Sequence, residues 1–297
     1  MISHKLNSDL LHYSIAIILT LCVGSIIFFQ LPISEPTQIY FLILVAGIIG
    51  IPHGRTDFII IRKISKSKIQ IIYYLFLYLA VVILVFYLWQ HIGLVLFLVF
   101  LLFSIYHFGS QDCKSHKIKN SALKIIAGSI IILIPLFFHQ ETSFYYNTLI
   151  GMNFFHNIEA NLSVIIFSIL IYLSYLIFKK LYLFFLETVI LISLLALLPP
   201  LISFTLYFSL WHTPRHYLEE ISELSPDEKL GNIFIILIIS FSILFSLAAF
   251  LIVGADSYKL SFKNEGVIFF KLIIGLTISH VLLNEAKSKL IRESEIN

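Results

Sequence analysis

Charged residues and cysteines are scarce in this sequence of 297 residues. Asp, Glu, Lys and Arg together make up 12% of it, whereas 59% is hydrophobic, a balance far outside the range of soluble globular domains. No polar stretch is long enough for a separate soluble domain, and apolar runs recur along the whole length. The sequence therefore predicts an integral membrane protein in which residues 1–297 form a single transmembrane domain.

The two cysteines, Cys22 and Cys113, have the spacing of neither a disulfide framework nor a zinc-type pair. The net charge is only +3, and the basic residues are scattered over short loops. They do not form the basic face interleaved with aromatic residues that nucleic-acid binding needs. These absences argue against thiol chemistry and against a nucleic-acid partner.

The apolar runs predict an all-α, polytopic membrane helix bundle with about ten transmembrane helices, in a range of roughly eight to ten. The first run lacks a small-x-small cleavage site and is expected to be a retained helix. The connection at 139–161 is expected to include an interfacial helix with aromatic anchors. The expected spans are residues 13–31, 38–61, 69–90, 92–112, 121–138, 162–178, 181–198, 200–217, 232–254 and 266–285.

The distribution of Lys and Arg predicts the orientation, because basic residues accumulate in short cytoplasmic loops. With the N-terminus inside, the outside loops hold only Lys259 and Lys263. We therefore expect a multi-pass protein of the cell membrane with both termini cytoplasmic. The basic residues of the expected inside segments fall within 62–68, 114–119, 179–180, 229 and 287–292.

Five histidines fall within the expected spans, each in the half nearer the cytoplasmic end. Ionisable side chains are costly inside a bilayer and usually face the bundle interior, where they mark a site. The expected helices that carry them all run in the same direction, so one site can collect a side chain from each. These histidines are His53, His107, His212, His216 and His280.

His212 and His216 are four residues apart, on one face of a helix, and can bind one metal ion together. Pro214 between them has no backbone N–H and is expected to loosen the turn upstream, which adjusts the two imidazoles. Imidazole ligands suit iron, copper, zinc or nickel. The residues alone leave open which of these metals is bound.

Two carboxylates follow histidines closely, Asp57 after His53 and Asp112 after His107. Metal-binding histidines commonly donate their second ring proton to a carboxylate. We expect each aspartate to orient its own or a neighbouring imidazole. Gly109, which lacks a side chain, is expected to let a neighbouring helix or a ligand approach closely.

The remaining polar groups are expected to have ordinary roles. Arg215 is expected to reach lipid phosphates at the interface or to pair with Glu219, rather than to act in chemistry. Glu187 receives no role. Tyr106, Phe108 and Trp211 are interpreted either as core packing or as the wall of a pocket for an apolar substrate. The histidines expected on solvated surfaces are His4, His12, His91, His116, His139 and His156.

The motifs "PHGRTD" at 52–57, "HFGSQD" at 107–112 and "WHTPRH" at 211–216 together resemble the Brp/Blh family of bacterial and archaeal membrane β-carotene 15,15'-dioxygenases. Their order and rough spacing match over about residues 45–285. The late "SHVLLNE" at 279–285 is similar to the family's C-terminal histidine segment, although Ile278 and Ser279 precede His280 where the family has a proline before the histidine.

The resemblance implies oxidative cleavage of the central double bond of β-carotene by O2, which gives two molecules of retinal. It implies non-haem Fe(II) held by His53, His107, His212 and His216, with His280 as a further candidate. The implied partners are β-carotene, O2, the lipid bilayer and a rhodopsin that receives retinal.

Two other classes also place histidines in membranes. Di-iron desaturases and hydroxylases resemble chains with repeated HxxxH and HxxHH boxes, whereas this chain has one HxxxH, at 212–216. A transporter or proton channel with a histidine relay predicts no bound metal and no carotenoid turnover.

Overall fold

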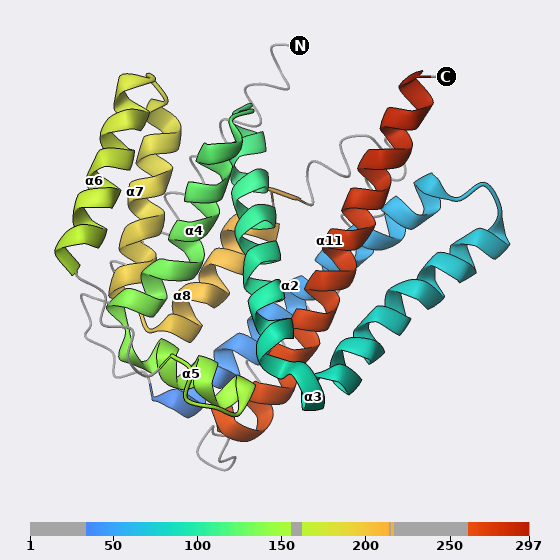
Figure 1. Cartoon of the computed structure of the whole chain (residues 1–297), viewed down its shortest axis with the longest axis horizontal. Coiled ribbons are helices and arrows are strands. Elements are labelled where there is room, and N and C mark those ends of the chain that lie inside the picture. The colour runs from blue at the N-terminus through green and yellow to red at the C-terminus, as the bar shows by residue number, and fades with distance from the viewer. Residues whose placement is uncertain (1–33, 156–161, 214, 217–260, 297) are drawn as a thin grey trace.

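The computed structural model describes residues 34–155, 162–213, 215–216 and 261–296, without the side chains of 46–55, 162, 210 and 288–296. All regular structure in this part of the chain is helical, which confirms the predicted all-α class. Most helices run between the two ends of the molecule, and α5 lies across the lower end (Figure 1). The expected spans 13–31 and 232–254 lie outside the described residues.

The helices of the described residues follow the expected spans closely, with short connections between them. The expected helix within the connection 139–161 is α5. In chain order the elements are α2 Glu35–Ile64, α3 Lys68–Ser115, α4 Ser121–Phe138, α5 Gln140–Ile150, α6 Leu162–Phe178, α7 Tyr182–Leu197, α8 Pro200–Leu206, the π-helix η1 Tyr207–His212, the π-helix η3 Phe262–Gly266 and α11 Val267–Ile296.

Two expected spans, 69–90 and 92–112, are the two arms of α3. This element has 48 residues and a non-helical backbone at Ile92, where φ is −134° and ψ is 36°. A straight helix of that length would extend about 72 Å, more than twice the roughly 30 Å of a bilayer core. Figure 1 shows the two arms meeting at a sharp bend at the lower end of the molecule. The bend therefore leaves each arm with the length of a single span.

Local sequence signals explain several helix ends. The side chain of Asn120 accepts hydrogen bonds from the backbone N–H groups of Ala122 and Leu123, which caps α4. Helix α5 ends at Gly151, whose φ of 73° is the left-handed conformation that glycine adopts without steric cost. Pro199 and Pro200 separate α7 from α8 as the sequence predicts, because proline cannot continue a helix but fits its first turn.

Helices α3 and α4 pack closely through two glycines. A Cβ atom on Gly109 would lie 1.8 Å from the carbonyl oxygen of Lys124, and one on Gly128 would lie 1.8 Å from the carbonyl oxygen of Ile105. Neither position can hold a side chain without moving a backbone. The expected close approach at Gly109 is therefore confirmed, and it brings α4 against the arm of α3 that carries His107.

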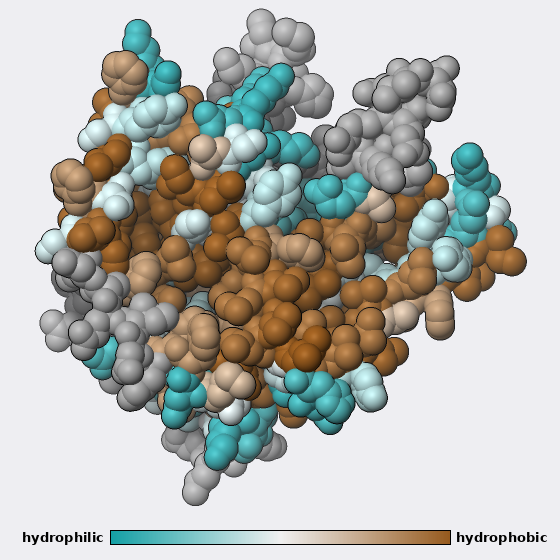
Figure 2. All heavy atoms as spheres, viewed as in Figure 1, coloured by the Kyte–Doolittle hydropathy of each residue, from teal (hydrophilic) through white to brown (hydrophobic). Residues whose placement is uncertain are grey.

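The surface of the molecule has the distribution of a membrane protein. Among the described residues, three helices are long and apolar enough to cross a membrane, Lys68–Ser115, Ser121–Phe138 and Phe262–Lys287, and α6 and α7 are shorter apolar helices. Hydrophobic atoms form a band across the middle of the molecule, and hydrophilic atoms gather at its upper and lower ends (Figure 2). The expected count of ten spans is not confirmed by these helices.

Two of the connections that carry basic residues lie at the upper end of the molecule. Figure 1 shows the α3–α4 and α6–α7 connections at the upper end, opposite α5, and the α2–α3 connection at the right-hand edge. These are the segments 62–68, 114–119 and 179–180, which the charge pattern assigns to a single side of the membrane. The orientation that the charge distribution predicts stays a prediction.

Candidate functional site

Four of the five expected site histidines come together in the interior of the bundle. The centroid of the His107 ring on α3 lies 5.1 Å from that of His212 and 4.9 Å from that of His280 on α11. The rings of His216 and His280 are 5.0 Å apart, and those of His212 and His216 are 6.2 Å apart. We call His107, His212, His216 and His280 the histidine cluster. His53 lies on α2, and its side chain is outside the described residues.

The segment that carries two members of this cluster has an unusual backbone. Residues 207–212 form the π-helix η1, and the N–H of Thr213 donates to the carbonyl of Phe208, five residues earlier. Single π-helical turns within helices are frequent at functional sites. The π-helix lies just upstream of position 214, where the sequence predicts a loosened turn. The rings of His212 and His216 are nearly parallel, with 27° between their planes.

Helix α2 supplies polar partners to the histidine cluster. The Nδ1–H of His280 donates to Oδ1 of Asp57, and the hydroxyl of Tyr78 donates to the other oxygen of the same carboxylate at 2.7 Å. The hydroxyl oxygen of Thr56 lies 3.4 Å from Nε2 of His216. Asp57 is therefore placed against His280, a histidine more than two hundred residues away in sequence.

Asp112 lies beside an arginine rather than beside His107. One of its oxygens is 3.7 Å from a guanidinium nitrogen of Arg215. Nε2 of His107 is buried and has no hydrogen-bond partner among the described residues. A buried imidazole nitrogen without a partner is suited to accept one, such as a ligand or a metal ion.

The expectation that Arg215 lies at the membrane interface was wrong. Arg215 is 3% exposed, and its guanidinium lies 2.9 Å from a carboxylate oxygen of Glu187 and over the ring of Trp211. A guanidinium is stable in the interior because carboxylates and an aromatic face replace its water. Glu187, which received no role from the sequence, is the main partner. No periodicity in the sequence pairs these two residues.

Two histidines expected on solvated surfaces are also placed differently. Nε2–H of His116 donates to Glu187 at 2.6 Å, and the His116 side chain is 9% exposed. Nε2–H of His139 donates to the carbonyl of Leu195 at 3.0 Å in a partly buried position. His91 is exposed, as expected. Both histidines are thus partly buried and bonded to another helix instead of being fully solvated.

An apolar cavity lies directly beside the histidine cluster. Its volume is about 70 Å³, and most of its wall is aromatic and aliphatic. Phe108 and Tyr207 line it, and both rings also contact His212, with centroid distances of 4.8 Å and 6.1 Å. Burial raises the pKa of Tyr145, which also lines the cavity, to about 12. All described residues in the cavity wall are uncharged, and Phe108 and Tyr207 connect this wall to His212.

The two other aromatic residues expected at the substrate pocket lie elsewhere. Tyr106 is half exposed on α3. Trp211 is buried and lines a smaller pocket together with Asp112, Glu187 and Arg215. Of the three expected aromatic residues, Phe108 is the one that lines the apolar cavity.

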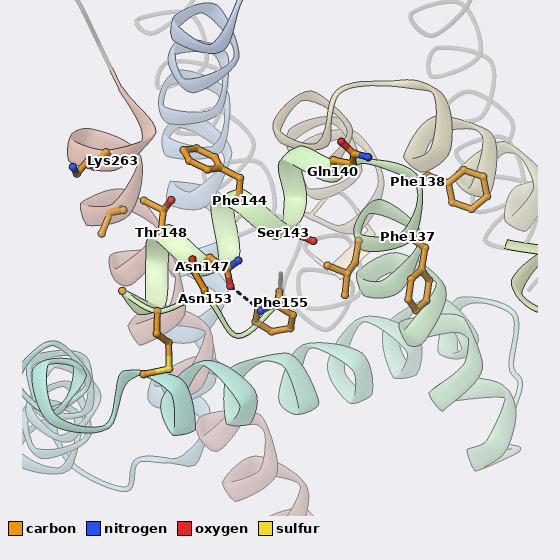
Figure 3. Close-up of a pocket in the computed structure, with 14 residues that line it drawn as sticks. Phe137, Phe138, Gln140, Ser143, Phe144, Asn147, Thr148, Asn153, Phe155 and Lys263 are labelled. Atoms are coloured by element: carbon orange, nitrogen blue, oxygen red, sulfur yellow. Dashed lines mark hydrogen bonds between the residues drawn. The ribbon is translucent and has the colours of Figure 1, made fainter. Parts of the chain in front are cut away.

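A larger cleft of about 1340 Å³ lies along α5, at the lower end of the molecule. Figure 3 shows Phe138 of α4, Ser143 and Asn147 of α5, and Lys263 of η3 around it. The backbone N–H of Phe155 donates to the side chain of Asn147 at 2.8 Å. Its described lining is mixed polar and aromatic and contains no histidine, so this cleft is separate from the histidine cluster.

The spacing of the rings in the cluster suits a shared metal ion. A metal such as zinc lies about 2.0–2.1 Å from an imidazole nitrogen and hence about 3 Å from the ring centre. Two rings around one ion then have centres about 4.5 Å apart at right angles and about 6 Å apart when opposite. The observed separations run from 4.9 to 6.2 Å. The donor set, made of neutral imidazoles in an apolar interior, also suits a transition metal.

The nitrogen atoms, however, are not all directed at one point. No group of three or more His, Cys, Asp or Glu side chains in the described part of the chain has the geometry of a metal site. The amide of Asn284 donates to Nε2 of His280 at 3.0 Å, and Nε2 of His216 faces Thr56. Metal binding by this set therefore requires some of the rings to turn from these partners.

These features define a class: an all-helical protein with helices of membrane-spanning length and a buried histidine cluster at the end of an apolar cavity. Comparison with known protein families matches residues 43–286 to the family described as beta-carotene 15,15'-dioxygenase. Because this match covers most of the chain, the chain belongs to that family, as the three motifs predicted. No curated protein and no solved structure matches it.

Proposed function

We propose that this protein cleaves the central 15,15' double bond of β-carotene with O2 and releases two molecules of retinal. The observation that carries the proposal is the contact between the apolar cavity and the histidine cluster through Phe108 and Tyr207. A polyene needs an apolar path, and the oxidation needs a metal centre at its end. Membership of the beta-carotene 15,15'-dioxygenase family supports this substrate.

The metal in this proposal is non-haem Fe(II). Ground-state O2 reacts sluggishly with a closed-shell alkene, and iron supplies the activation of O2 when it is bound. The described side chains that would hold it are His107, His212, His216 and His280. His53, on α2 in the "PHG" motif, is the fifth candidate.

Asp57 has the proposed role of orienting His280. Its carboxylate accepts the Nδ1–H of His280, which leaves Nε2 as the basic nitrogen of that ring. Tyr78, through its hydroxyl, holds the carboxylate from the other side. A carboxylate behind a histidine fixes the tautomer and makes the imidazole a better ligand. The amide of Asn284 donates to this Nε2, and metal binding at Nε2 would replace that hydrogen bond.

The walls of the cavity have the proposed role of selecting the bond that is cleaved. At about 70 Å³ the cavity is far smaller than β-carotene, so substrate entry requires wall side chains to turn aside. Phe108 and Tyr207 stand between the cavity and His212. The depth to which the polyene passes these two rings would decide which double bond reaches the histidine cluster.

We further propose that the protein is a multi-pass protein of the cell membrane with both termini cytoplasmic. The basic α3–α4 and α6–α7 connections at the upper end and the hydrophobic band across the face seen in Figure 2 support this arrangement. β-Carotene dissolved in the bilayer would enter sideways between helices. The retinal product would return to the lipid or pass to a rhodopsin.

The test is expression of the chain in bacteria that make β-carotene, with an empty-vector strain as the control and the membrane content of the protein measured. We expect loss of the orange colour and accumulation of retinal on chromatography, two molecules for each β-carotene consumed. Persistence of β-carotene with the protein in the membrane would contradict the proposal. Aldehydes of other chain lengths would contradict cleavage at the central bond.

A further inference from the structure

A second buried polar group lies next to the histidine cluster and takes no part in the function proposed above. It consists of Arg215, Glu187, Asp112 and His116, which we call the charge cluster. The two oxygens of Glu187 have different partners, Arg215 at 2.9 Å and His116 at 2.6 Å. Asp112 lies 3.7 Å from the same guanidinium. The charge cluster thus joins α3, α7 and the turn that follows η1.

The burial of these groups requires an explanation. Arg215, Asp112 and Glu187 are each at most 3% exposed. Taking charges out of water is costly even when they are paired, and apolar side chains of similar volume commonly stabilise a protein as well or better. Packing alone therefore does not account for an arginine and two carboxylates at this position.

The place of Arg215 in the chain indicates what the charge cluster does. Arg215 immediately precedes His216, and its guanidinium stacks over the ring of Trp211, the residue before His212, at 4.2 Å. The side chain therefore spans the turn that carries both histidines. Glu187, on α7, forms an ion pair with the guanidinium of Arg215. The regular α-helical register is broken over residues 207–212, so contacts from other helices contribute to the direction of the two imidazoles.

Glu187 is itself held in place. Nε2–H of His116, close to the end of α3, donates to its second oxygen, and Thr188 beside it is bonded to the backbone of its own helix. The carboxylate therefore has one oxygen on α3 and the other on Arg215. The hydrogen bond from His116 and the ion pair with Arg215 thus connect the end of α3, α7 and the turn at 212–216.

We propose that the Arg215–Glu187 ion pair, supported by Asp112 and His116, is a positioning device that orients His212 and His216 for metal binding. Arg215 and Glu187 are positioning residues that act through the two histidines and do not touch substrate. The inference rests on the proposed function in one respect, namely that iron is the metal. It predicts that loss of the charge cluster weakens iron binding and leaves carotene binding nearly unchanged.

The first experiment compares Glu187→Gln and Glu187→Asp with Glu141→Gln, which changes an exposed carboxylate on α5. Iron affinity is measured on the purified full-length protein in detergent by titration with Fe(II) under anaerobic conditions. Groups behind metal ligands typically contribute about 10–100-fold to affinity. We expect a loss in that range for Glu187→Gln, partial recovery for Glu187→Asp, and no change for Glu141→Gln. KM for β-carotene should stay nearly unchanged, because none of these substitutions alters Phe108 in the wall of the apolar cavity.

A second variant separates positioning from stability. The triple variant Asp112→Asn, Glu187→Leu, Arg215→Met removes the permanent charges together, so no buried charge is left unpaired, and it is expected to unfold at a temperature close to that of the unchanged protein. If the charge cluster positions the histidines, this well-folded variant still binds iron at least about tenfold more weakly. Normal iron affinity in the triple variant overturns the inference.

The same titration keeps this inference distinct from the proposed function. If the unchanged protein binds Fe(II) and cleaves β-carotene while the triple variant binds iron equally well, the positioning role alone fails. If the unchanged protein binds no Fe(II), the proposed iron centre fails, and the positioning role fails with it. Equal losses of iron affinity in Glu187→Gln and in the surface variant Glu141→Gln also contradict the inference.

Discussion

The turn at residues 211–216 has two buried polar surroundings that differ in kind. His212 and His216 meet other imidazoles, those of His107 and His280, whereas Arg215 meets carboxylates. Neutral imidazoles can gather in an apolar interior without compensating charges, but a guanidinium cannot. One short segment therefore needs two sets of partners, and the helices around it are arranged to supply both.

The two aspartates of the sequence motifs show the same contrast. Asp57 follows His53 by four residues, and Asp112 follows His107 by five. Asp57 accepts from His280 and belongs to the histidine cluster, whereas Asp112 lies by Arg215 and belongs to the charge cluster. A similar local pattern thus serves two roles, because the partner on the neighbouring helix decides which one applies.

The largest effect is expected from the histidines themselves. His212→Ala or His216→Ala removes an imidazole from the histidine cluster, and we expect retinal formation to fall by more than about 100-fold, with iron content reduced in parallel. Activity is measured as retinal formed per protein in membranes, and iron by metal analysis of the purified protein. His91→Ala is the matched control, because His91 is exposed. Normal iron content and activity in both variants would show that His212 and His216 are not metal ligands.

A smaller effect should distinguish the two aspartates. Asp57→Asn removes the carboxylate that accepts from His280 and Tyr78, so we expect Fe(II) affinity to fall by about 10–100-fold. Asp112→Asn leaves Glu187 as the nearer partner of Arg215 and is expected to have a smaller effect on the same titration. If Asp112→Asn weakened iron binding more than Asp57→Asn, the assignment of Asp57 to the histidine cluster and Asp112 to the charge cluster would be contradicted.

The smallest effect is expected at the cavity wall. Phe108→Leu keeps the side chain apolar and similar in volume, so folding should be little affected. A loss of about 1 kcal/mol of contact with the polyene would raise KM for β-carotene about fivefold, while iron affinity stays the same. Tyr106→Leu changes a half-exposed ring outside the cavity and should leave KM unchanged. Equal KM values in the two variants would contradict the proposed path of the substrate.

Much of the fold follows from the sequence because it depends on local signals. The bounds of α4, α6 and α7 follow from apolar runs that end at polar or proline residues. The bend at Ile92 agrees with the separation of two expected spans. The expected span 200–217 is less regular than predicted, since a π-helix occupies 207–212. A change of hydrogen-bond register within a helix leaves the hydrophobic pattern almost unaltered.

The site was predictable in part. The sequence singled out each member of the histidine cluster, because ionisable residues stand out in apolar runs. It did not predict that Arg215 would be buried beside Glu187, or that His116 would bond to the same carboxylate. The only available signal was the isolated Glu187 in the middle of an apolar run, which requires a buried partner without saying which one.

By itself the sequence determined the all-helical class, the family and the candidate histidines, since composition, periodicity and short motifs are local properties of the chain. Only the tertiary structure decided that Asp57 serves His280, that Asp112 and Glu187 serve Arg215, and that Phe108 rather than Tyr106 faces the apolar cavity. The physical reason is that a buried polar group takes whichever partner the neighbouring helix presents. That choice depends on how helices far apart in sequence cross and rotate against each other.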